Sequence, residues 1–592
     1  MMPRKITALA ALGAAGALGL AACGTSGGGK GSGPTGSSSS FNAAITSVVN
    51  PSTTDTHGAM TVDLNVTPDS TDYQNTYYAY MWDFVRLYSM SLLTYKSCPG
   101  LCGTQLAPDL ATGLGTPSDG NRVWTYHIQP DVKFQNGDTV TSTDVKYGVE
   151  RTFAKTLLPA GPIYYQVLLQ DGTYPGPYSD PKKNLMGLTS VTTPNPTTVV
   201  FHLNQPFADF NYVVAIPQST PVEPKWDTGS HSGANYQLDP ESTGPYEFQS
   251  YSLNKQLILV PNPYWKQSTD LQAKQLLSKI TVNMSVNQST VDQNQLAGYA
   301  QLDLHGLGIS TASVKDKVLT TPSLKADTDN PINGFLRFDY INSKEIPNVH
   351  CREAIEYAAD KTTLQDAYGG PIVGGQIATT VMPPTVTGYK NYGDLYNSTS
   401  QPGGDDAAAK QQLALCGKPS GFTTSLAYRT DTPGDTQSAT ALQAALKAVG
   451  INVTLLGFPT AKYYSNFAGV PAYVHSHDIG IATGGWGADW PDGYGFLYDI
   501  ADGTAIAPAG NSNISEINDP TINSLFNTAA ASTSTAQETA IWPQIDEDIM
   551  KGAYILPIVY QKVLLYRDPN LTNVYVDSYY GMYNYAVIGL KK

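Results

Sequence analysis

The residues best suited to chemistry lie in one short stretch, Ile479 to Asp492. An apolar run typical of a strand leads into glycines, which are followed by a large aromatic residue and a carboxylate. Gly485 and Gly487 carry no side chain and would let the backbone of a ligand approach closely. Trp486 could wall a pocket. A buried carboxylate is unfavourable on its own, so a desolvated Asp489 requires a cationic partner. This combination suits binding better than bond breaking.

A simpler interpretation of this stretch stays open. Asp489 and Asp492 could be only turn and helix-capping residues ahead of Tyr494. His475 and His477, just upstream, would share one face of a strand and could then hold a metal ion. No third ligand can be placed beside them, so we predict no metal site.

The sequence contains only weak indications of catalytic residues. Gly24 to Gly28 has the spacing of a nucleophile elbow, but neither the preceding strand nor the following helix that such an elbow needs. We find no nucleophile with a base, no paired carboxylates and no metal cluster in a suitable context. We therefore expect neither enzyme activity nor a cofactor. A secreted hydrolase remains the alternative from another class, because scattered residues can converge in a fold.

The elements that would position such a site are best defined between residues 106 and 153. Trp124 and Tyr126 alternate with polar neighbours at the period of a half-buried strand. Two turns follow. Thr141 then precedes Asp144 by three residues, the arrangement of a capping box at the start of a helix.

The order of these elements, and of others further along, closely resembles the extracellular solute-binding proteins of family 5. That family includes the peptide-, oligopeptide-, nickel- and some oligosaccharide-binding components of ABC importers. The matching segments run in order through most of the chain: Leu106 to Ala111, Trp124 to Ile128, Val132 to Asp138, Thr141 to Val145, Ser242 to Phe248, Leu257 to Trp265, Val349 to Lys361 and Gly485 to Asp492.

The resemblance implies roles for single residues. In peptide-binding members the last segment pairs with the peptide main chain, and its first Asp takes the amino-terminal ammonium. Carried over, Gly485 and Gly487 would offer backbone hydrogen bonds, Trp486 would wall a side-chain pocket and Asp489 would bind the ligand amine. The binding mode would be strand addition.

Two further positions follow from the same resemblance. Tyr164 and Tyr165 fall roughly where relatives place a ligand-contacting tyrosine, although ordinary packing explains them equally well. Thr483 stands where some oligopeptide binders have a basic residue near the peptide carboxylate. Either the chain does not select peptides by length through such a contact, or its ligand carries no carboxylate there.

The implied fold class is α/β: a periplasmic-binding-protein-like two-lobe fold with a hinge and an extra small α/β domain, of the cluster C type. We expect lobe I to comprise residues 43–93, 209–330 and 556–592. The extra domain would comprise residues 94–208, and lobe II residues 331–555.

The amino terminus is typical of an exported lipoprotein. Arg4 and Lys5 precede an apolar run, and Leu20 to Cys23 looks like a bacterial lipobox. We predict a signal peptide over residues 1–22, lipid on Cys23, and a flexible Gly/Ser tether over residues 23–42.

Composition agrees with an exported globular protein. The chain is 41% hydrophobic and 14% charged, and its net charge of −14 argues against a nucleic-acid partner. Four cysteines remain besides Cys23, an even number suited to an oxidising compartment. Cys98 and Cys102 could close a local disulfide, and Cys351 and Cys416 are candidates for a second one, which only geometry can decide.

Taken together, these features predict a monomeric binding component, anchored by lipid to the outer face of the bacterial cell membrane. It would capture peptides or oligopeptides in a cleft between the lobes and deliver them to an ABC permease with its ATPase subunits. An oligosaccharide or a metal complex is the alternative solute.

Overall fold

We describe the protein from a computed structural model, in which residues 40–52, 57–180 and 186–591 are described. The signal peptide predicted over residues 1–22, Cys23 and most of the tether lie outside these residues. No helix within the described ranges combines the length and the apolar character needed to cross a membrane.

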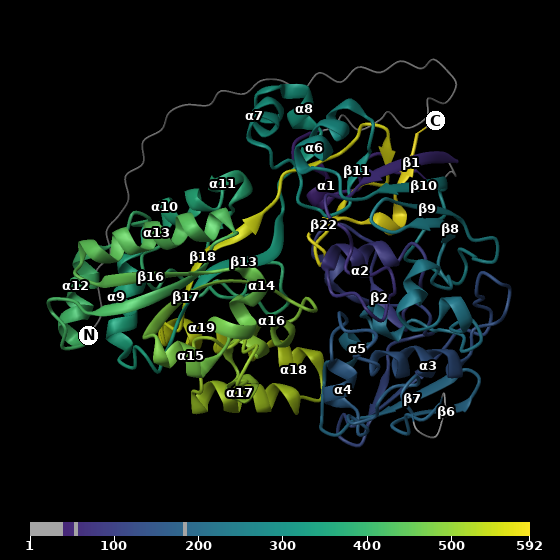
Figure 1. Ribbon diagram of the computed structural model, residues 1–592, viewed down its shortest axis with the longest axis horizontal. Helices are drawn as coiled ribbons and strands as arrows, with labels where there is room; N and C mark the ends of the chain where they lie inside the picture. Colours follow the sequence, from purple (N-terminus) through teal and green to yellow (C-terminus); the bar gives the residue numbers. More distant parts are fainter. Residues whose placement is uncertain (1–39, 53–56, 181–185, 592) are drawn as a thin grey trace, which may run out of the picture. The chain divides into compact units, whose positions relative to one another are not determined.

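One sheet is built mainly from the first half of the chain, and we call it the lobe I sheet (Figure 1). Its five strands have the order β11-β1-β10-β9-β8. β1 runs parallel to β10 and β11, and β8 to β10 form an antiparallel meander. Its strands and the helices of the same region are β1 (Gly58–Asp63), β8 (Tyr246–Ser252), β9 (Gln256–Pro261), β10 (Leu277–Asn283), β11 (Leu302–Asp303), α1 (Ala43–Thr46), α2 (Ala79–Val85), α6 (Gln288–Ala297), α7 (Ala312–Thr320) and α8 (Pro322–Ala326).

A four-stranded antiparallel sheet, ordered β4-β5-β7-β6, forms the core of the small domain. Buried side chains of β5 alternate with less buried ones, as the sequence predicted. Thr141 and Asp144 form the predicted capping box of α3. The elements here are β2 (Leu93–Tyr95), β3 (Leu106–Pro108), β4 (Thr116–Ser118), β5 (Val123–His127), β6 (Val191–Asn195), β7 (Thr198–His202), α3 (Ser142–Thr152), α4 (Tyr164–Leu168) and α5 (Phe210–Val213).

The third sheet, which we call the lobe II sheet, has six strands in the order β14-β18-β13-β17-β15-β16. β13 is antiparallel to β17 and β18, whereas β15 is parallel to β16 and β17. The strands are β13 (Ile332–Ile341), β14 (Gln376–Ile377), β15 (Thr423–Arg429), β16 (Asn452–Phe458), β17 (Ile479–Gly487) and β18 (Ile555–Lys562).

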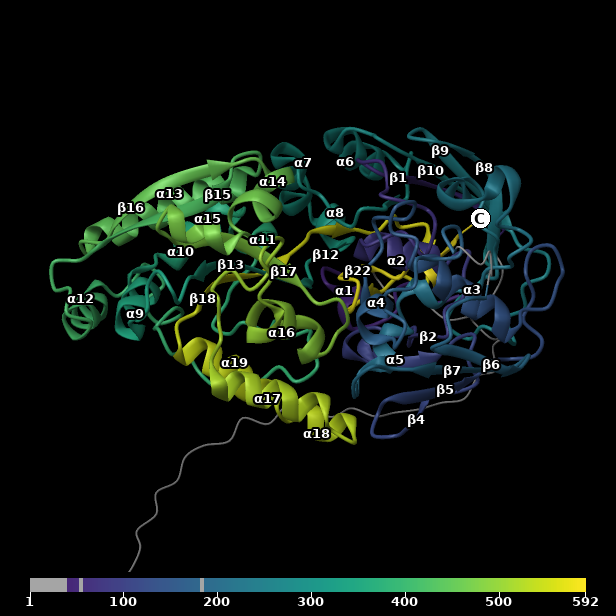
Figure 2. The same cartoon turned by 60° about the horizontal axis from the view of Figure 1, so that its bottom comes forward.

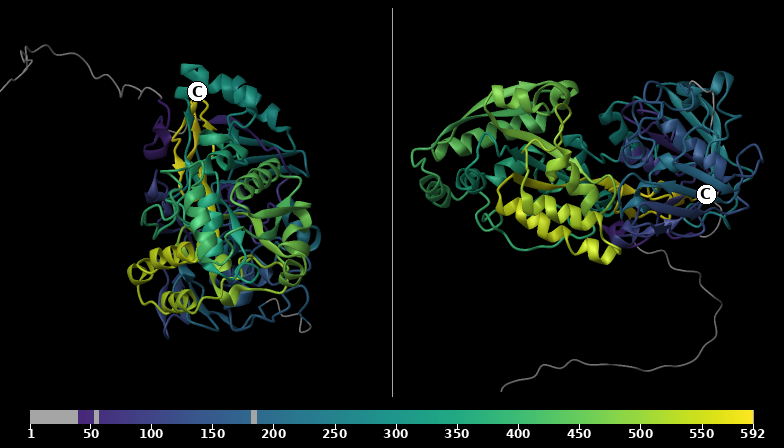
Figure 3. Two further views of the ribbon diagram at one scale, coloured as in Figure 1. Left: turned by 90° about the vertical axis from the view of Figure 1, so that its left-hand side faces the viewer. Right: turned by 90° about the horizontal axis from the view of Figure 1, so that it is seen from below.

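Helices cover both faces of the lobe II sheet (Figures 1 and 2). One apolar core packs against α9 (Val349–Ala358), α10 (Lys361–Ala367), α12 (Asp406–Leu415) and α13 (Pro433–Ala448). The other packs against α16 (Gly493–Ala501), α17 (Pro520–Ala530) and α19 (Trp542–Lys551), which appear in yellow tones in Figure 3. Shorter helices are α11 (Gly370–Val373), α14 (Thr460–Lys462), α15 (Pro471–Ser476) and α18 (Thr535–Thr539).

The chain passes between the lobe I and lobe II sheets at β12 (Thr328–Asp329) and β19 (Leu565–Tyr566), which pair with each other. The Asp329 carboxylate is buried here and accepts hydrogen bonds from Arg567, from the Tyr583 hydroxyl and from the Ala44 amide. The last strands are β20 (Leu571–Thr572), β21 (Val576–Asp577), β22 (Met582–Tyr583) and β23 (Gly589–Leu590).

Two features of lobe II could not be read from the sequence. The matching segment Val349 to Lys361 forms two helices, because Ala359 is extended and Asp360 caps α10 through the Thr363 amide. β18 pairs with β13, so the lobe II sheet continues past the boundary predicted at residue 555.

Candidate functional site

Asp489 lies just beyond the carboxyl end of β17, in the short connection to α16. Only 9% of its surface is exposed. The chain is fixed at this point by a hydrogen bond from the Asp489 amide to the Gly495 carbonyl, at 3.2 Å. The carboxylate is therefore held in a defined place rather than on a mobile turn.

Three tyrosines from distant segments converge on Asp489. The Tyr77 hydroxyl donates to Asp489 Oδ2 at 2.7 Å, and the Tyr164 hydroxyl donates to the same oxygen. The Tyr579 hydroxyl donates to the Asp489 carbonyl at 2.7 Å. Tyr77 precedes α2, Tyr164 begins α4 and Tyr579 follows β21, so the site joins elements far apart in the sequence.

The electrostatics of Asp489 are those of a charge without a counter-ion. Burial raises the pKa of Asp489, and the hydroxyls of Tyr164 and Tyr77 lower it in part. Burial and the neighbouring Asp489 charge hold the pKa of both tyrosines well above its ordinary value, so both stay protonated donors. No basic residue of the described chain contributes. A buried carboxylate without a cation costs several kcal/mol, on the order of the desolvation of one ion.

One edge of β17 is unpaired beside this carboxylate. β13 pairs with β17 as far as Gly487, whereas β15 pairs with it only as far as Ala482. From Thr483 to Gly487 the strand therefore has no strand partner on its β15 side among the described residues. The Tyr463 hydroxyl donates a hydrogen bond to the Thr483 carbonyl there. An extended ligand could pair with such an edge.

The two predicted glycines have a structural reason as well. A Cβ on Gly485 would come within 2.7 Å of Nη1 of Arg337, and one on Gly487 within 2.6 Å of the Phe335 ring. Both neighbours lie directly across the strand pair on β13. Any side chain at these positions would displace them, whether or not a ligand is bound.

Trp486 lies between the two glycines and packs, half-buried, against the core of lobe II. Its indole Nε1 is buried and has no hydrogen-bond partner among the described residues. Trp490, the second aromatic residue of the stretch, is buried and donates from Nε1 to Asp209 at 3.2 Å. Trp486 thus has an unsatisfied donor, whereas Trp490 is a core residue.

The two adjacent tyrosines of α4 differ in position. Tyr164 reaches Asp489, as described above. Tyr165 is fully buried and stacks on Phe201, with ring centroids 6.1 Å apart. The structure brings Tyr164 together with Asp489 and places Tyr165 in the core of the small domain.

Sequence reasoning missed Tyr77 and Tyr579, and also Asp499 on α16, whose charge interacts with that of Asp489. Thr483, where a basic residue was considered, is fully buried, and its hydroxyl lies 3.3 Å from Asp435. Arg337, on the neighbouring strand, is the basic side chain nearest to Gly485. No sequence spacing connects these residues, because each comes from a different element.

Among the described residues, one carboxylate cluster could geometrically hold a metal ion: Asp209, Asp492 and Glu538, whose oxygens lie within 4.8 Å of one another. Asp492 also caps α16 through the Tyr494 amide, the role that the simpler interpretation gave it. Burial and the neighbouring carboxyls raise the pKa of all three, that of Glu538 to about 8. The raised pKa values favour the protonated, uncharged form of these three carboxyls.

The histidine pair is not arranged as a strand would arrange it. His475 is in the last turn of α15 and His477 follows that helix. Nδ1 of His475 lies 2.6 Å from Glu345, and the His477 ring stacks on Tyr473 at 3.8 Å. The rings have separate surroundings.

All four described cysteines are paired. Cys98 bonds to Cys102, with their Cα atoms 5.7 Å apart, and Cys351 bonds to Cys416, with Cα atoms 5.4 Å apart. The second bond joins α9 to the end of α12. Cys23 lies outside the described residues.

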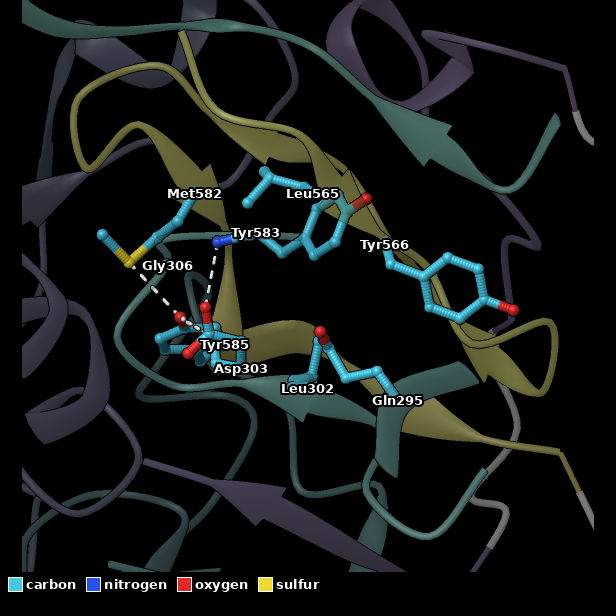
Figure 4. A pocket seen from close by; sticks show the side chains of 10 residues that line it. Gln295, Leu302, Asp303, Gly306, Leu565, Tyr566, Met582, Tyr583 and Tyr585 are labelled. Carbon is cyan, nitrogen blue, oxygen red and sulfur yellow. Dashed lines mark hydrogen bonds between the residues drawn. The ribbon is translucent and has the colours of Figure 1, made fainter. Parts of the chain in front are cut away.

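A small pocket elsewhere is separate from Asp489 (Figure 4). The Tyr585 hydroxyl lies at this pocket and donates to the carbonyls of Asp303 and Leu304. None of the predicted ligand residues lines it. Its lining is Gln295, Leu302, Asp303, Gly306, Gly308, Leu565, Tyr566, Met582, Tyr583 and Tyr585.

The lobe I and lobe II sheets, together with the small domain, form the two-lobe fold of a solute-binding protein. Residues 105–508 match the family described as "Bacterial extracellular solute-binding proteins, family 5 Middle". The chain belongs to this family, which confirms the resemblance seen in the sequence and removes the hydrolase alternative. Its members work outside the cytoplasm as binding proteins.

Known proteins similar to the chain extend over most of its length. A solved structure titled "Clavulanic acid biosynthesis oligopeptide binding protein 2" is 36% identical, covers 94% of this chain and 99% of its own, and has a TM-score of 0.88. A probable D,D-dipeptide-binding periplasmic protein of Escherichia coli is 25% identical over 83% of this chain and 85% of its own. Heme-binding protein A of Haemophilus influenzae is 25% identical over 81% of this chain and 83% of its own.

Proposed function

We propose that this protein is the lipid-anchored solute-binding component of an ABC importer, which captures peptides at Asp489 and delivers them to a membrane permease. One observation carries the peptide assignment: an unpaired strand edge ends beside a buried carboxylate that no cation of the described residues neutralises. A peptide supplies both missing partners, a main chain for the edge and an ammonium for the carboxylate.

The contacts suggest how each residue would act. The edge from Thr483 to Gly487 would hydrogen-bond to the peptide main chain, as in strand addition. The ammonium would complete the hydrogen bonds of Asp489, whose Oδ1 has no partner among the described residues. Trp486 would border the side-chain pocket. Backbone recognition of this kind gives affinity while tolerating different side chains.

Access to Asp489 requires movement. Tyr77 and Tyr164 cover its carboxylate, and they belong to other elements than β17 and α16. A ligand must therefore enter while these elements are apart, and the tyrosines would then close over it. Hinge motion of this type is common in two-lobe binding proteins, and β12 and β19 are where the chain could bend.

The names of the relatives support peptides without fixing them. Two of the three similar proteins are named for peptides and the third for heme. A metal complex is therefore the first alternative solute, and an oligosaccharide is the second. Lipid attachment at Cys23 and delivery to a permease rest on the amino-terminal motif and on the family. Cys23→Ser should release the protein from the membrane fraction.

Calorimetry with a matched pair of peptides tests the site. Trialanine has an amino-terminal ammonium, which N-acetyl-trialanine replaces by an uncharged acetyl amide. We expect acetylation to weaken binding to the wild type by about tenfold or more, since hydrogen bonds to charged groups contribute about 1.5–3 kcal/mol. Asp489→Asn should bind both peptides equally weakly at an almost unchanged melting temperature.

Asp131→Asn is the matched control, because Asp131 is exposed and makes no hydrogen bond or ion pair among the described residues. It should behave as the wild type does. Unchanged trialanine affinity in Asp489→Asn would remove Asp489 from the site.

A further inference from the structure

Trp490 reaches from lobe II into the small domain. It follows β17 and precedes α16, yet its indole belongs to the apolar core that lobe I shares with the small domain and is only 1% exposed. The ring lies against those of Tyr164, Phe207 and Tyr212, with centroids 5.1, 6.3 and 6.4 Å away. Its Nε1 donates to Asp209 at 3.2 Å. A single lobe II side chain thus fills a socket whose walls come from the small domain.

Three carboxyls meet beside this indole, one from the small domain and two from lobe II. Asp209 immediately precedes α5, Asp492 caps α16 and Glu538 lies on α18. Their oxygens lie within 4.8 Å of one another, and all three side chains are buried. Carboxyls this close attract one another while they share protons, and they repel one another once they are ionised. The contact between lobe II and the small domain therefore depends on bound protons.

No cation of the described residues balances these carboxyls. The titratable groups that interact with them across the packed elements are the carboxyls themselves, Tyr212 of α5 and Tyr494 of α16. Both phenols keep their protons, because burial holds their pKa well above its ordinary value. A carboxylate formed at this contact would thus have no positive neighbour within the described chain.

The same contact covers Asp489. Tyr164 donates its hydroxyl to the Asp489 carboxylate and places its ring against Trp490. Because Asp489 and Trp490 are consecutive in the chain, α4 cannot move away from one of them without leaving the other. At a further point of the contact, Nδ2 of Asn121 in the small domain donates to the Ser532 carbonyl at 2.9 Å. Seating of the indole and covering of the Asp489 carboxylate are therefore parts of one movement.

We call Trp490 together with Asp209, Asp492 and Glu538 the interlobe latch. We propose that this latch closes with uptake of protons and determines how long a ligand stays bound at Asp489. The inference rests on the proposed function and adds the step that regulates release. A bound solute would leave only after the indole has left its socket. When the lobes part, water solvates the three carboxyls and they give up their protons.

The direction of the pH dependence follows from the pKa of each carboxyl in the two states. In the open form the carboxyls are solvated and have ordinary pKa values, 3.8 for Asp and 4.5 for Glu. In the closed form, burial raises the pKa of Glu538 to about 8 and holds that of both Asp residues well above the ordinary value. Protons therefore stabilise the closed form fully below about pH 4, and this stabilisation is lost as the pH rises through about 8.

Small-angle X-ray scattering of the ligand-free protein tests the latch without any assumption about the solute. The radius of gyration of the wild type should increase between pH 5 and pH 9 as the lobes part. Trp490→Ala should be expanded already at pH 5 and should change little with pH. Glu538→Gln keeps a neutral side chain, so its radius should increase less than that of the wild type. Asp131→Asn is the matched control and should behave as the wild type does.

Stopped-flow dissociation of trialanine measures the effect on ligand retention. At pH 7, Trp490→Ala should raise the dissociation rate by about tenfold or more, the effect expected when a buried aromatic anchor is removed from an interface. The wild-type rate should increase from pH 6 to pH 9, and it should increase less in Glu538→Gln. Asp131→Asn should keep the wild-type rate at each pH.

The outcomes separate the two proposals. A wild-type radius that stays constant from pH 5 to pH 9, or equal radii and equal dissociation rates in the wild type and Trp490→Ala, would overturn the latch and leave the proposed function intact. Absence of trialanine binding would contradict the proposed function, and scattering would still decide on the latch. If Trp490→Ala does not fold, a smaller pH effect in Glu538→Gln supports the latch, and an unchanged effect overturns it.

Discussion

At the scale of residues, the site depends on how a single carboxylate is solvated. Asp489 could be singled out from the sequence as a candidate because it lies in a continuous stretch with glycines and Trp486. Tyr77 and Tyr579 were not, because the sequence holds 38 tyrosines and no spacing marks the two that reach Asp489. The neighbours Tyr164 and Tyr165 show the same limit, since sequence could not tell the one at the site from the one in the core.

The hydrogen bonds that the Tyr77 and Tyr164 hydroxyls donate to Asp489 should affect the pH dependence of peptide binding. A cationic peptide binds the ionised carboxylate, so affinity is lost as the pH falls through the pKa of Asp489, which burial raises above its ordinary value of 3.8. Tyr164→Phe removes a donor that lowers this pKa, so affinity should be lost at a higher pH than in the wild type.

Dissociation constants for trialanine between pH 4 and 8 measure this shift. Tyr165→Phe is the matched control, because the Tyr165 hydroxyl is buried and has no hydrogen-bond partner among the described residues, and its pH profile should follow the wild type. Identical profiles for Tyr164→Phe and Tyr165→Phe would contradict the assignment.

Trp486 should report binding by fluorescence. Its half-buried indole with an unsatisfied Nε1 borders the proposed pocket, so a peptide should change its emission. Trp486→Ala should abolish the larger part of the ligand-induced change. A signal that persists undiminished would come from another tryptophan.

At the scale of elements, sequence patterns predicted those whose ends carry local signals. α3 begins at the capping box that Thr141 and Asp144 predict. The break between α9 and α10 was missed because the apolar periodicity continues across Ala359 and Asp360. The unpaired edge of β17 beyond Ala482, on the side of β15, could not be predicted either. It depends on where the pairing between β15 and β17 stops in the folded chain.

The disulfide between α9 and α12 should stabilise the fold more than the local one. It closes a loop of 65 residues, against 4 for Cys98–Cys102. Chain entropy then predicts a loss of about 4 kcal/mol in the free energy of unfolding for Cys351→Ser with Cys416→Ser, and about 2 kcal/mol for the other pair. Denaturant unfolding of both double variants measures the two losses in free energy of unfolding. Equal losses would contradict the expected dependence on loop length.

At the scale of the whole molecule, many carboxyls are buried with raised pKa values. Burial first of all raises the pKa of Glu150 and Glu538 to about 8 and that of Asp546 to about 7. The folded protein therefore holds protons that the unfolded chain has lost above pH 5. These groups contribute full stability below their unfolded pKa values, and the contribution is lost as the pH rises through 7 to 8.

We therefore expect the melting temperature to fall by several degrees between pH 5 and pH 9. Glu538→Gln keeps a neutral side chain at all pH values and should flatten part of this slope. Calorimetric scans at intervals of one pH unit measure both. A melting temperature that rises steadily to pH 9 would contradict the burial of these groups in protonated form.

The central claim is that the molecule binds peptides through their amino end at Asp489. Native mass spectrometry of the purified protein, as isolated and after mixing with trialanine and its N-acetyl form, tests it most directly. We predict adducts of peptide mass that denaturation releases, with trialanine retained by the wild type and lost in Asp489→Asn. Adducts in steps of hexose mass or of heme mass, or equal retention of the acetylated peptide, would contradict the claim.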